Sequence, residues 1–236
     1  MAAIDFGSYG SGYAFSFKHE FEANPINVST PLWSPESGGD SCYKTPSAML
    51  LDSKKKLVAF GHDADDRYSQ ICEANNQNSW YYLKGFKMQL YKAVLDRKDI
   101  RKDFSMKEIN GKEISAKLVI QLAIKYLRDH LLQLFKERNI GIKPDDIEWV
   151  LTVPAIWNDA CKQFMRDAAI GAGIRGGMFS IVYEPEAASV YARLLPVDRF
   201  VGENKTTILK TFDPGKKFIV VDAGGGTVDY LKHLLQ

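Results

Sequence analysis

The clearest periodic pattern in the chain lies between residues 114 and 138. Apolar residues recur there mostly three or four positions apart, and charged residues occupy much of the remaining surface. The apolar series is Ile120, Ile124, Leu127, Leu131, Leu134 and Phe135. Gly141 and Pro144 follow the series and end it. The pattern therefore predicts one long amphipathic helix with its apolar side against a core.

Short apolar runs before and after this helix in the chain predict β-strands. Residues 2–17 alternate around a glycine-rich turn from Gly7 to Gly12, which is typical of a hairpin. Residues 47–60 predict a second hairpin, with a run of three lysines at its tip.

After the long helix, strands and helices alternate. We expect strands at residues 147–153 and 179–183, each followed by a helix. The first of these helices ends near residue 171 and has Asn158 or Asp159 as its cap, and the second begins at Glu184. This alternation predicts an α/β fold with a mixed sheet.

The last apolar run, residues 218–221, precedes Asp222, three consecutive glycines, Thr227 and Asp229. Such a turn leaves backbone N–H groups bare enough to approach a phosphate closely. Residues 230–236 lack the alternation of a returning strand, and we expect a helical or non-native tail there.

Composition narrows the partners that are expected. The chain has 236 residues, 45% hydrophobic and 25% charged, with a net charge of +2. This balance is typical of a globular protein and does not favour nucleic acid as a partner. Three cysteines without a CxxC spacing indicate free thiols in a reducing compartment. No apolar run reaches the length of a membrane span and no signal peptide is evident, so a cytoplasmic location without a membrane partner is expected.

Two aspartate-x-glycine turns stand out as candidate chemistry, one at Asp5 and Gly7 and one at Asp222 and Gly224. Each follows a predicted buried strand. A single turn of this kind is common and has little specificity, but a pair predicts two facing phosphate cradles whose carboxylates share a Mg²⁺ ion. The sequence contains neither a P-loop nor a dinucleotide-binding glycine motif that begins a helix.

Two further segments have simple structural explanations. Glu184 can complement the dipole of the helix that it begins, and Pro154 can simply end the strand before it. These explanations remain open for each segment taken alone.

In combination, the segments resemble the nucleotide-binding domain of the heat-shock 70 kDa chaperones, within the actin and sugar-kinase superfamily. Phe86, Lys87, Met88, Trp157 and a long connector after residue 196 make the chain most similar to the divergent 12A/12B branch. The segments that resemble the family occur in the family's order, at residues 4–7, 45–47, 151–159, 183–188 and 221–229.

The resemblance implies roles for individual residues around ATP or ADP and Mg²⁺. Asp5 and Asp222 would hold the metal, and Asp222 or Asp229 would polarise the attacking water. Glu184 would lie near the metal and that water, and Lys87 would reach the terminal phosphate. Two phosphate loops are implied, the first formed by Gly7, Ser8 and Tyr9 and the second by Gly224, Gly225, Gly226 and Thr227.

The resemblance also implies an architecture. It is lobe I of an actin-like, ribonuclease H-like ATPase, with a mixed β-sheet flanked by helices and a small inserted subdomain. The expected boundaries are 1–44 with 113–196 for the core subdomain, 45–112 for the insertion, 197–216 for a connector, and 217–236 for the start of lobe II and a tail.

The function implied is that of a truncated nucleotide-binding domain of a chaperone-like protein of the stress response. We expect weak or absent ATP hydrolysis, because nucleotide in this fold is clamped between two lobes. Two alternatives remain open: a non-enzymatic module that binds a protein partner or co-chaperone, and an ATPase completed by dimerisation or by a second chain. A sugar kinase fits the residues at 184–188 less well. The exposed edge of the last hairpin predicts a homodimer through the C-terminal segment.

Overall fold

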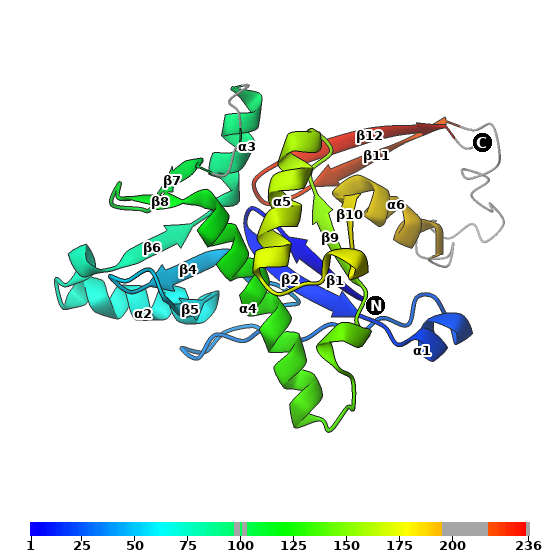
Figure 1. The fold of residues 1–236 in the computed structure, drawn as a ribbon, viewed down its shortest axis with the longest axis horizontal. Helices are drawn as coiled ribbons and strands as arrows, with labels where there is room; N and C mark the ends of the chain where they lie inside the picture. The colour runs from blue at the N-terminus through cyan, green and yellow to red at the C-terminus, as the bar shows by residue number, and fades with distance from the viewer. Residues whose placement is uncertain (97–99, 101–102, 195–216, 235–236) are drawn as a thin grey trace.

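The computed structural model describes residues 1–96, 100, 103–194 and 217–234, and a five-stranded mixed sheet lies at its centre (Figure 1). The strand order is β10-β9-β1-β2-β3. Strands β1, β9 and β10 are parallel, and β2 is antiparallel to both of its neighbours. The mixed sheet of the predicted α/β fold is therefore present. Its strands are β1 (Ala2–Phe6), β2 (Gly10–Phe15), β3 (Thr45–Pro46), β9 (Trp149–Val153) and β10 (Phe179–Tyr183).

Helices α4 (Ala116–Glu137), α5 (Asp159–Gly171) and α6 (Glu184–Leu194) flank this sheet (Figure 1), and they confirm the three helices that have clear sequence signals. The long periodic segment forms α4, and the Asn158 side chain caps α5 by accepting a hydrogen bond from the Cys161 N–H at 3.0 Å. The α-helices are α1 (Lys18–Ala23), α2 (His62–Glu73), α3 (Lys87–Leu95), α4 (Ala116–Glu137), α5 (Asp159–Gly171) and α6 (Glu184–Leu194). Short 3₁₀ helices are found at Gln77–Ser79, Pro144–Asp146 and Gly176–Met178.

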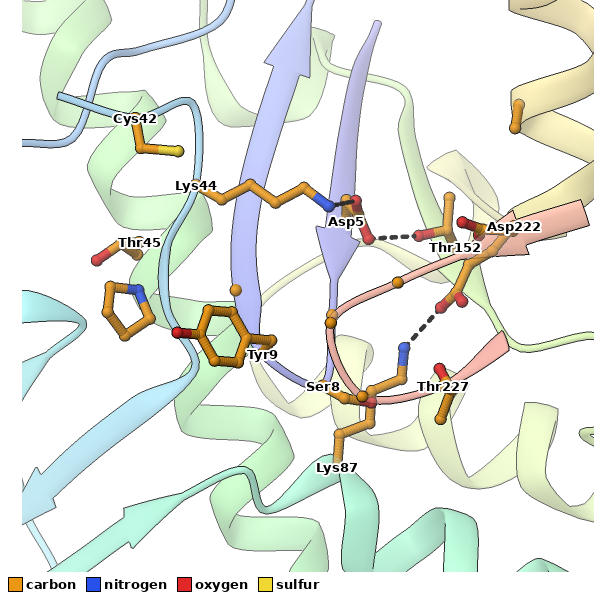
Figure 2. A pocket seen from close by; sticks show the side chains of 18 of the residues that line it. Asp5, Ser8, Tyr9, Cys42, Lys44, Thr45, Lys87, Thr152, Asp222 and Thr227 are labelled. Atoms are coloured by element: carbon orange, nitrogen blue, oxygen red, sulfur yellow. Dashed lines mark hydrogen bonds and ion pairs between the residues drawn. The ribbon is translucent and has the colours of Figure 1, made fainter. Parts of the chain in front are cut away.

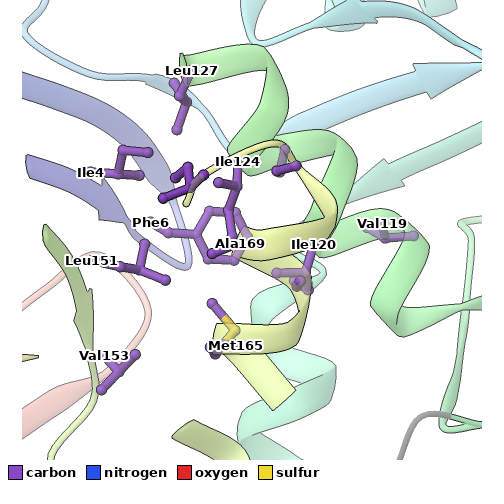
Figure 3. Close-up of a cluster of buried hydrophobic side chains, with 14 of the residues drawn as sticks. Ile4, Phe6, Val119, Ile120, Ile124, Leu127, Leu151, Val153, Met165 and Ala169 are labelled. Atoms are coloured by element: carbon purple, nitrogen blue, oxygen red, sulfur yellow. The ribbon is translucent and has the colours of Figure 1, made fainter. Parts of the chain in front are cut away.

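The main hydrophobic core lies between this sheet and helices α4 and α5 (Figure 3). The apolar side of α4 meets the side chains that point from β1 and β9 because alternate strand residues share one face. Burial of each such side chain contributes roughly 1.5–3 kcal/mol. The side chains at the centre of this contact are Ile4, Phe6, Ile120, Ile124, Leu127, Leu151, Val153, Met165 and Ala169.

A second, three-stranded sheet forms beside the first, with the order β5-β4-β6. Its antiparallel pair β4–β5 confirms the predicted hairpin, and Lys54 and Lys56 are exposed in the turn. The Asp52 carboxylate accepts hydrogen bonds from the backbone N–H groups of both lysines at 2.9 Å, so this turn has a local structural explanation. The strands are β4 (Ala48–Leu51), β5 (Leu57–Phe60) and β6 (Tyr81–Lys84), with a separate pair β7 (Ser105–Lys107) and β8 (Glu113–Ser115).

Gly61 joins β5 to α2 in a conformation that other residues adopt at a cost. Its φ is +67°, and a Cβ atom there would lie 1.9 Å from Thr45 Oγ1. Gly85 also has a positive φ, +59°, but no atom lies within 4 Å of the position a Cβ would take. We therefore expect Gly61→Ala to lose about 2 kcal/mol of unfolding free energy and Gly85→Ala about 1 kcal/mol. Urea unfolding of both variants measures the difference, and equal losses would contradict the steric explanation.

The C-terminal segment differs from the sequence-based expectation. Residues 228–234 do not form a helical or non-native tail but strand β12 (Val228–Leu234), paired antiparallel with β11 (Lys217–Ala223) over seven residue pairs. The turn between them is closed by a hydrogen bond from the Gly224 N–H to the Thr227 carbonyl at 2.9 Å. Backbone pairing across this short turn fixes the strand even without side-chain alternation. The expected connector, 197–216, lies outside the described residues.

The first hairpin turn is also shorter than predicted. The sequence suggested a turn from Gly7 to Gly12, whereas β2 already begins at Gly10. Both later glycines accommodate the neighbouring segment: a Cβ on Gly10 would lie 3.2 Å from Lys44 Cβ, and one on Gly12 would lie 2.9 Å from the Tyr43 carbonyl oxygen. Within the described ranges, no helix is long and apolar enough to span a bilayer.

A half-buried histidine in α4, His130, is expected to make the free energy of unfolding depend on pH. His130 Nδ1 lies 2.8 Å from the Tyr13 hydroxyl, and its ring packs 4.3 Å from that of Trp33. Burial lowers the pKa of His130, while the charge of Glu137 opposes the shift. The ring of Tyr126 lies 6.3 Å from that of His130.

The unfolded chain therefore binds a proton more readily than the folded one. The contribution of His130 to the free energy of unfolding is fully present above the ordinary histidine pKa of about 6.5. Below that value it is expected to fall by at most about 1.4 kcal/mol per pH unit, down to the lowered folded pKa. Denaturant unfolding from pH 8 to 5 measures this decrease. His130→Gln is the control, since glutamine does not titrate, and an identical decrease in that variant would contradict the assignment to His130.

Candidate functional site

The carboxyl ends of the three parallel strands place polar side chains side by side. Asp5 is near the end of β1, Thr152 is in β9, and Glu184 directly follows β10. Because Ile4 is paired with Leu151, the next residues along both strands are neighbours, and Thr152 Oγ1 donates to Asp5 Oδ1 at 3.3 Å. Ligands in α/β sheets bind at this kind of strand edge.

The first glycine turn, Gly7–Tyr9, is held in place by Ser47. The Ser47 hydroxyl donates to the Gly7 carbonyl at 2.6 Å, and the Ser47 N–H donates to the Tyr9 carbonyl at 2.9 Å. Ser11 contacts the same hydroxyl at 2.7 Å. The segment at residues 45–47, for which the family resemblance implied no role, thus fixes the shape of the first turn.

The second glycine turn, Gly224–Thr227, lies directly against the first although more than 200 residues separate them (Figure 2). A Cβ on Gly225 would be 3.0 Å from Tyr9 Cβ, and one on Gly226 would be 3.3 Å from Ser8 Cβ. The two turns therefore approach closely only because these positions are glycines.

A cavity of about 670 Å³ lies between the two turns and the strand ends. Asp222 lines it from β11, and Asp5 and Glu184 line it from the ends of β1 and β10. Asp229 is paired with Asp222 in the register of the hairpin. The predicted site residues that line the cavity are Asp5, Gly7, Ser8, Tyr9, Lys87, Glu184, Asp222, Gly224, Gly225, Gly226 and Thr227.

Lys87, the first residue of α3, forms a buried ion pair with Glu184. Its Nζ donates to Glu184 Oε1 at 2.6 Å, and the two side chains are 3% and 15% exposed. The ammonium also lies 5.8 Å from the ring of Phe6 and 5.9 Å from that of Trp157. Removing either partner of such a pair would leave a charge in a poorly solvated place.

Lys44 forms a second, more exposed ion pair in the same cavity. Its Nζ lies 2.5 Å from Asp5 Oδ2 (Figure 2). Burial lowers the pKa of Lys44, but the charge of Asp5 and the hydrogen bond to it act in the opposite direction, with smaller contributions from Asp222 and Glu184. The net result is a raised pKa, so the side chain is cationic at neutral pH.

Sequence reasoning missed Lys44 and assigned no role to Thr152. Lys44 immediately precedes the segment at 45–47, and this proximity was the only available signal. Asp40, Cys42 and His62 also line the cavity. They come from the loop before β3 and from the start of α2, whose path the apolar pattern does not predict.

The donor set suits a phosphate with Mg²⁺. Carboxylates are hard oxygen ligands, and the glycine turns leave room for a phosphate to approach the backbone. Within the described part of the chain, no three or more His, Cys, Asp or Glu side chains gather closely enough to hold a metal by themselves. Mg²⁺ is commonly bound by one or two carboxylates together with phosphate oxygens, and Asp5 and Asp222 could supply those carboxylates.

A mixed sheet flanked by helices, with two glycine turns meeting at its edge, defines an actin-like ATPase fold. The chain is 32% identical to heat shock 70 kDa protein 12A of Mus musculus over 280 residues, and 32% identical to heat shock 70 kDa protein 12B of Homo sapiens over 281 residues. Both matches include 100% of this chain. Chaperone protein DnaK of Ureaplasma urealyticum serovar 10 is 32% identical over 184 residues, 78% of this chain and 23% of that protein. No family model matches.

The chain belongs to the heat-shock 70 kDa protein family, in its divergent 12A/12B branch. It spans 40% of the length of the 12A and 12B relatives.

Proposed function

We propose that the chain binds ATP or ADP with Mg²⁺, its phosphates between the two glycine turns, as the nucleotide-binding part of a chaperone-like protein. The observation that supports this most strongly is the direct contact of Gly225 with Tyr9, which unites turns from opposite ends of the chain around one cavity. Asp5 and Asp222 line the same cavity and would hold the metal.

The remaining residues would act by position and charge. Backbone N–H groups of the turns would bind phosphate oxygens, Lys87 would reach the terminal phosphate, and Glu184 would act near the metal and the attacking water. Asp222 or Asp229 would polarise that water. Phosphoryl transfer depends mainly on such positioning and on charge neutralisation, which Mg²⁺ supplies when it is bound.

Hydrolysis by this chain alone is proposed to be weak or absent. The site is open to solvent: Tyr9, which lines it, is 77% exposed, and the Asp5 side chain is 41% exposed. An open site neither excludes bulk water nor strengthens electrostatic interactions with the transition state.

Calorimetric titration with Mg-ATP and Mg-ADP tests the binding. Asp5→Asn and Asp222→Asn should each weaken it, whereas Asp145→Asn, at an exposed ion pair with Arg175, should leave it unchanged. Equal affinity in all four proteins would contradict the proposal and would favour a non-enzymatic interaction module.

We also propose that the C-terminal hairpin supports a homodimer, which could complete an ATPase site. Ile219 and Val221 are each 63% exposed and Val228 is 60% exposed, so an apolar face lies beside strand edges that pair with no further strand among the described residues. Light scattering should show a dimer that Val221→Lys disrupts; a monomer at high concentration would contradict this. We further propose a cytoplasmic location and co-chaperone partners, and the support for both is membership of the family.

A further inference from the structure

Strand β2 leaves room for the Lys44 side chain to cross the sheet. Lys44 precedes β3, which pairs with β2 through Gly10 and Ser11. A Cβ on Gly10 would lie 3.2 Å from Lys44 Cβ, and one on Gly12 would lie 3.5 Å from Lys44 Cγ. The two glycines, two positions apart in β2 and therefore on one face of it, leave the space in which the aliphatic part of Lys44 crosses β2 and reaches β1.

The end of this path is the carboxylate that the proposed function assigns to the metal. Lys44 Nζ contacts Asp5 Oδ2, while Thr152 contacts Asp5 Oδ1 (Figure 2). Asp5 thus has a hydrogen-bonding partner at both oxygens. An ammonium occupies the place beside Asp5 where a divalent cation would be bound.

The two lysines of the cavity differ in how firmly they are held. The Lys87–Glu184 pair is nearly enclosed, whereas the side chains of Lys44 and Asp5 are 50% and 41% exposed. An ion pair as exposed as the second is weak and exchanges readily with solvent ions. One ammonium is therefore fixed in the wall of the cavity and the other is exchangeable.

We propose that the Lys44 ammonium occupies the cation position beside Asp5 and competes there with Mg²⁺. Nucleotide binding would then depend less on the metal. This inference rests on the proposed function. An ammonium and Mg²⁺ beside the same Asp5 oxygen repel each other, so binding of the metal at Oδ2 is opposed while Lys44 stays in place. In the absence of metal, Lys44 supplies positive charge beside the nucleotide phosphates.

Binding of Mn²⁺ to the nucleotide-free protein, followed by electron paramagnetic resonance, tests the competition. Removing the exposed pair in Lys44→Met should raise the Mn²⁺ affinity severalfold, up to about fivefold, since an exposed pair of this kind is worth at most about that factor. Lys44→Arg should keep the wild-type affinity, and adding Asp5→Asn to Lys44→Met should remove the gain. Lys44→Gln serves as a second variant without the charge.

An unchanged or lower Mn²⁺ affinity in both Lys44→Met and Lys44→Gln would overturn the proposal, as would the absence of Mn²⁺ binding in both. This measurement needs no nucleotide, so it gives an answer even if titration shows that the wild type does not bind Mg-ATP. In that case the proposed function fails and the competition at Asp5 is still decided.

A second titration uses ADP with EDTA and then with Mg²⁺. The affinity for ADP with Mg²⁺, divided by the affinity for ADP with EDTA, should be larger in Lys44→Met than in the wild type. The variant loses the positive charge that binds phosphates without metal, and it binds the metal more tightly. Equal ratios in the two proteins would overturn the claim about metal dependence.

Discussion

Replacing Glu184 by glutamine is expected to lower the unfolding free energy by about 3 kcal/mol, because it leaves a buried lysine without a counter-charge. The Lys87 side chain is 3% exposed, and its Nζ contacts Glu184 Oε1 at 2.6 Å. The rings of Phe6 and Trp157 beside it cannot replace a carboxylate at that distance. Equilibrium unfolding in guanidinium chloride measures the loss.

Two further variants separate this effect from an ordinary surface substitution. Lys87→Met combined with Glu184→Gln should recover part of the stability, since no unpaired charge remains. Lys125→Met breaks an exposed pair with Asp129 in α4, whose side chains are 50% and 43% exposed, and should cost less than about 1 kcal/mol. A Glu184→Gln loss no larger than that of Lys125→Met would show that the buried pair has no special importance.

Gly225→Val is expected to weaken Mg-ADP binding roughly a hundredfold, equivalent to about 2.7 kcal/mol. The first added carbon would already lie 3.0 Å from Tyr9 Cβ, and the two methyl groups would fill the space between the glycine turns. Because Gly225 is exposed in a turn, we expect little change in thermal stability. Calorimetric titration gives the affinity, and a thermal melt gives the stability.

Gly141→Val is the matched control for this variant. Gly141 is exposed, has no atom within 4 Å of an added Cβ, and does not line the cavity. Its affinity for Mg-ADP should equal that of the wild type. An unchanged affinity in Gly225→Val would mean that nucleotide does not bind between the turns.

The fold was predictable from the sequence where a local pattern determines the element. The period of the apolar residues located α4, and the Asn158 cap located the start of α5. The last strand was missed because residues 230–234 have no alternation of their own, and β12 forms through its backbone pairing with β11. Similarly, Gly10 and Gly12 look like turn residues, but they lie in a strand that Lys44 crosses.

The candidate site was predictable where aspartate and glycine follow a strand, and less so elsewhere. The structure brings Asp5 and Asp222 to one cavity, as the paired turns suggested, while their roles stay predictions. Lys44 could not be found by pattern, since its partner Asp5 is 39 positions away and only the pairing of β2 with β3 brings them together. Charge pairs between distant segments depend on register, which a single sequence does not specify.

Hydrogen–deuterium exchange with and without Mg-ADP tests the central claim most directly, that the nucleotide phosphates are bound between the two glycine turns. Amides of Gly7–Tyr9 and of Gly224–Thr227 should both exchange more slowly when Mg-ADP is present, since both turns line the same cavity. The same protection should be lost from both turns in Asp222→Asn. Unchanged exchange in both turns at saturating Mg-ADP, or protection of only one of them, would contradict the account.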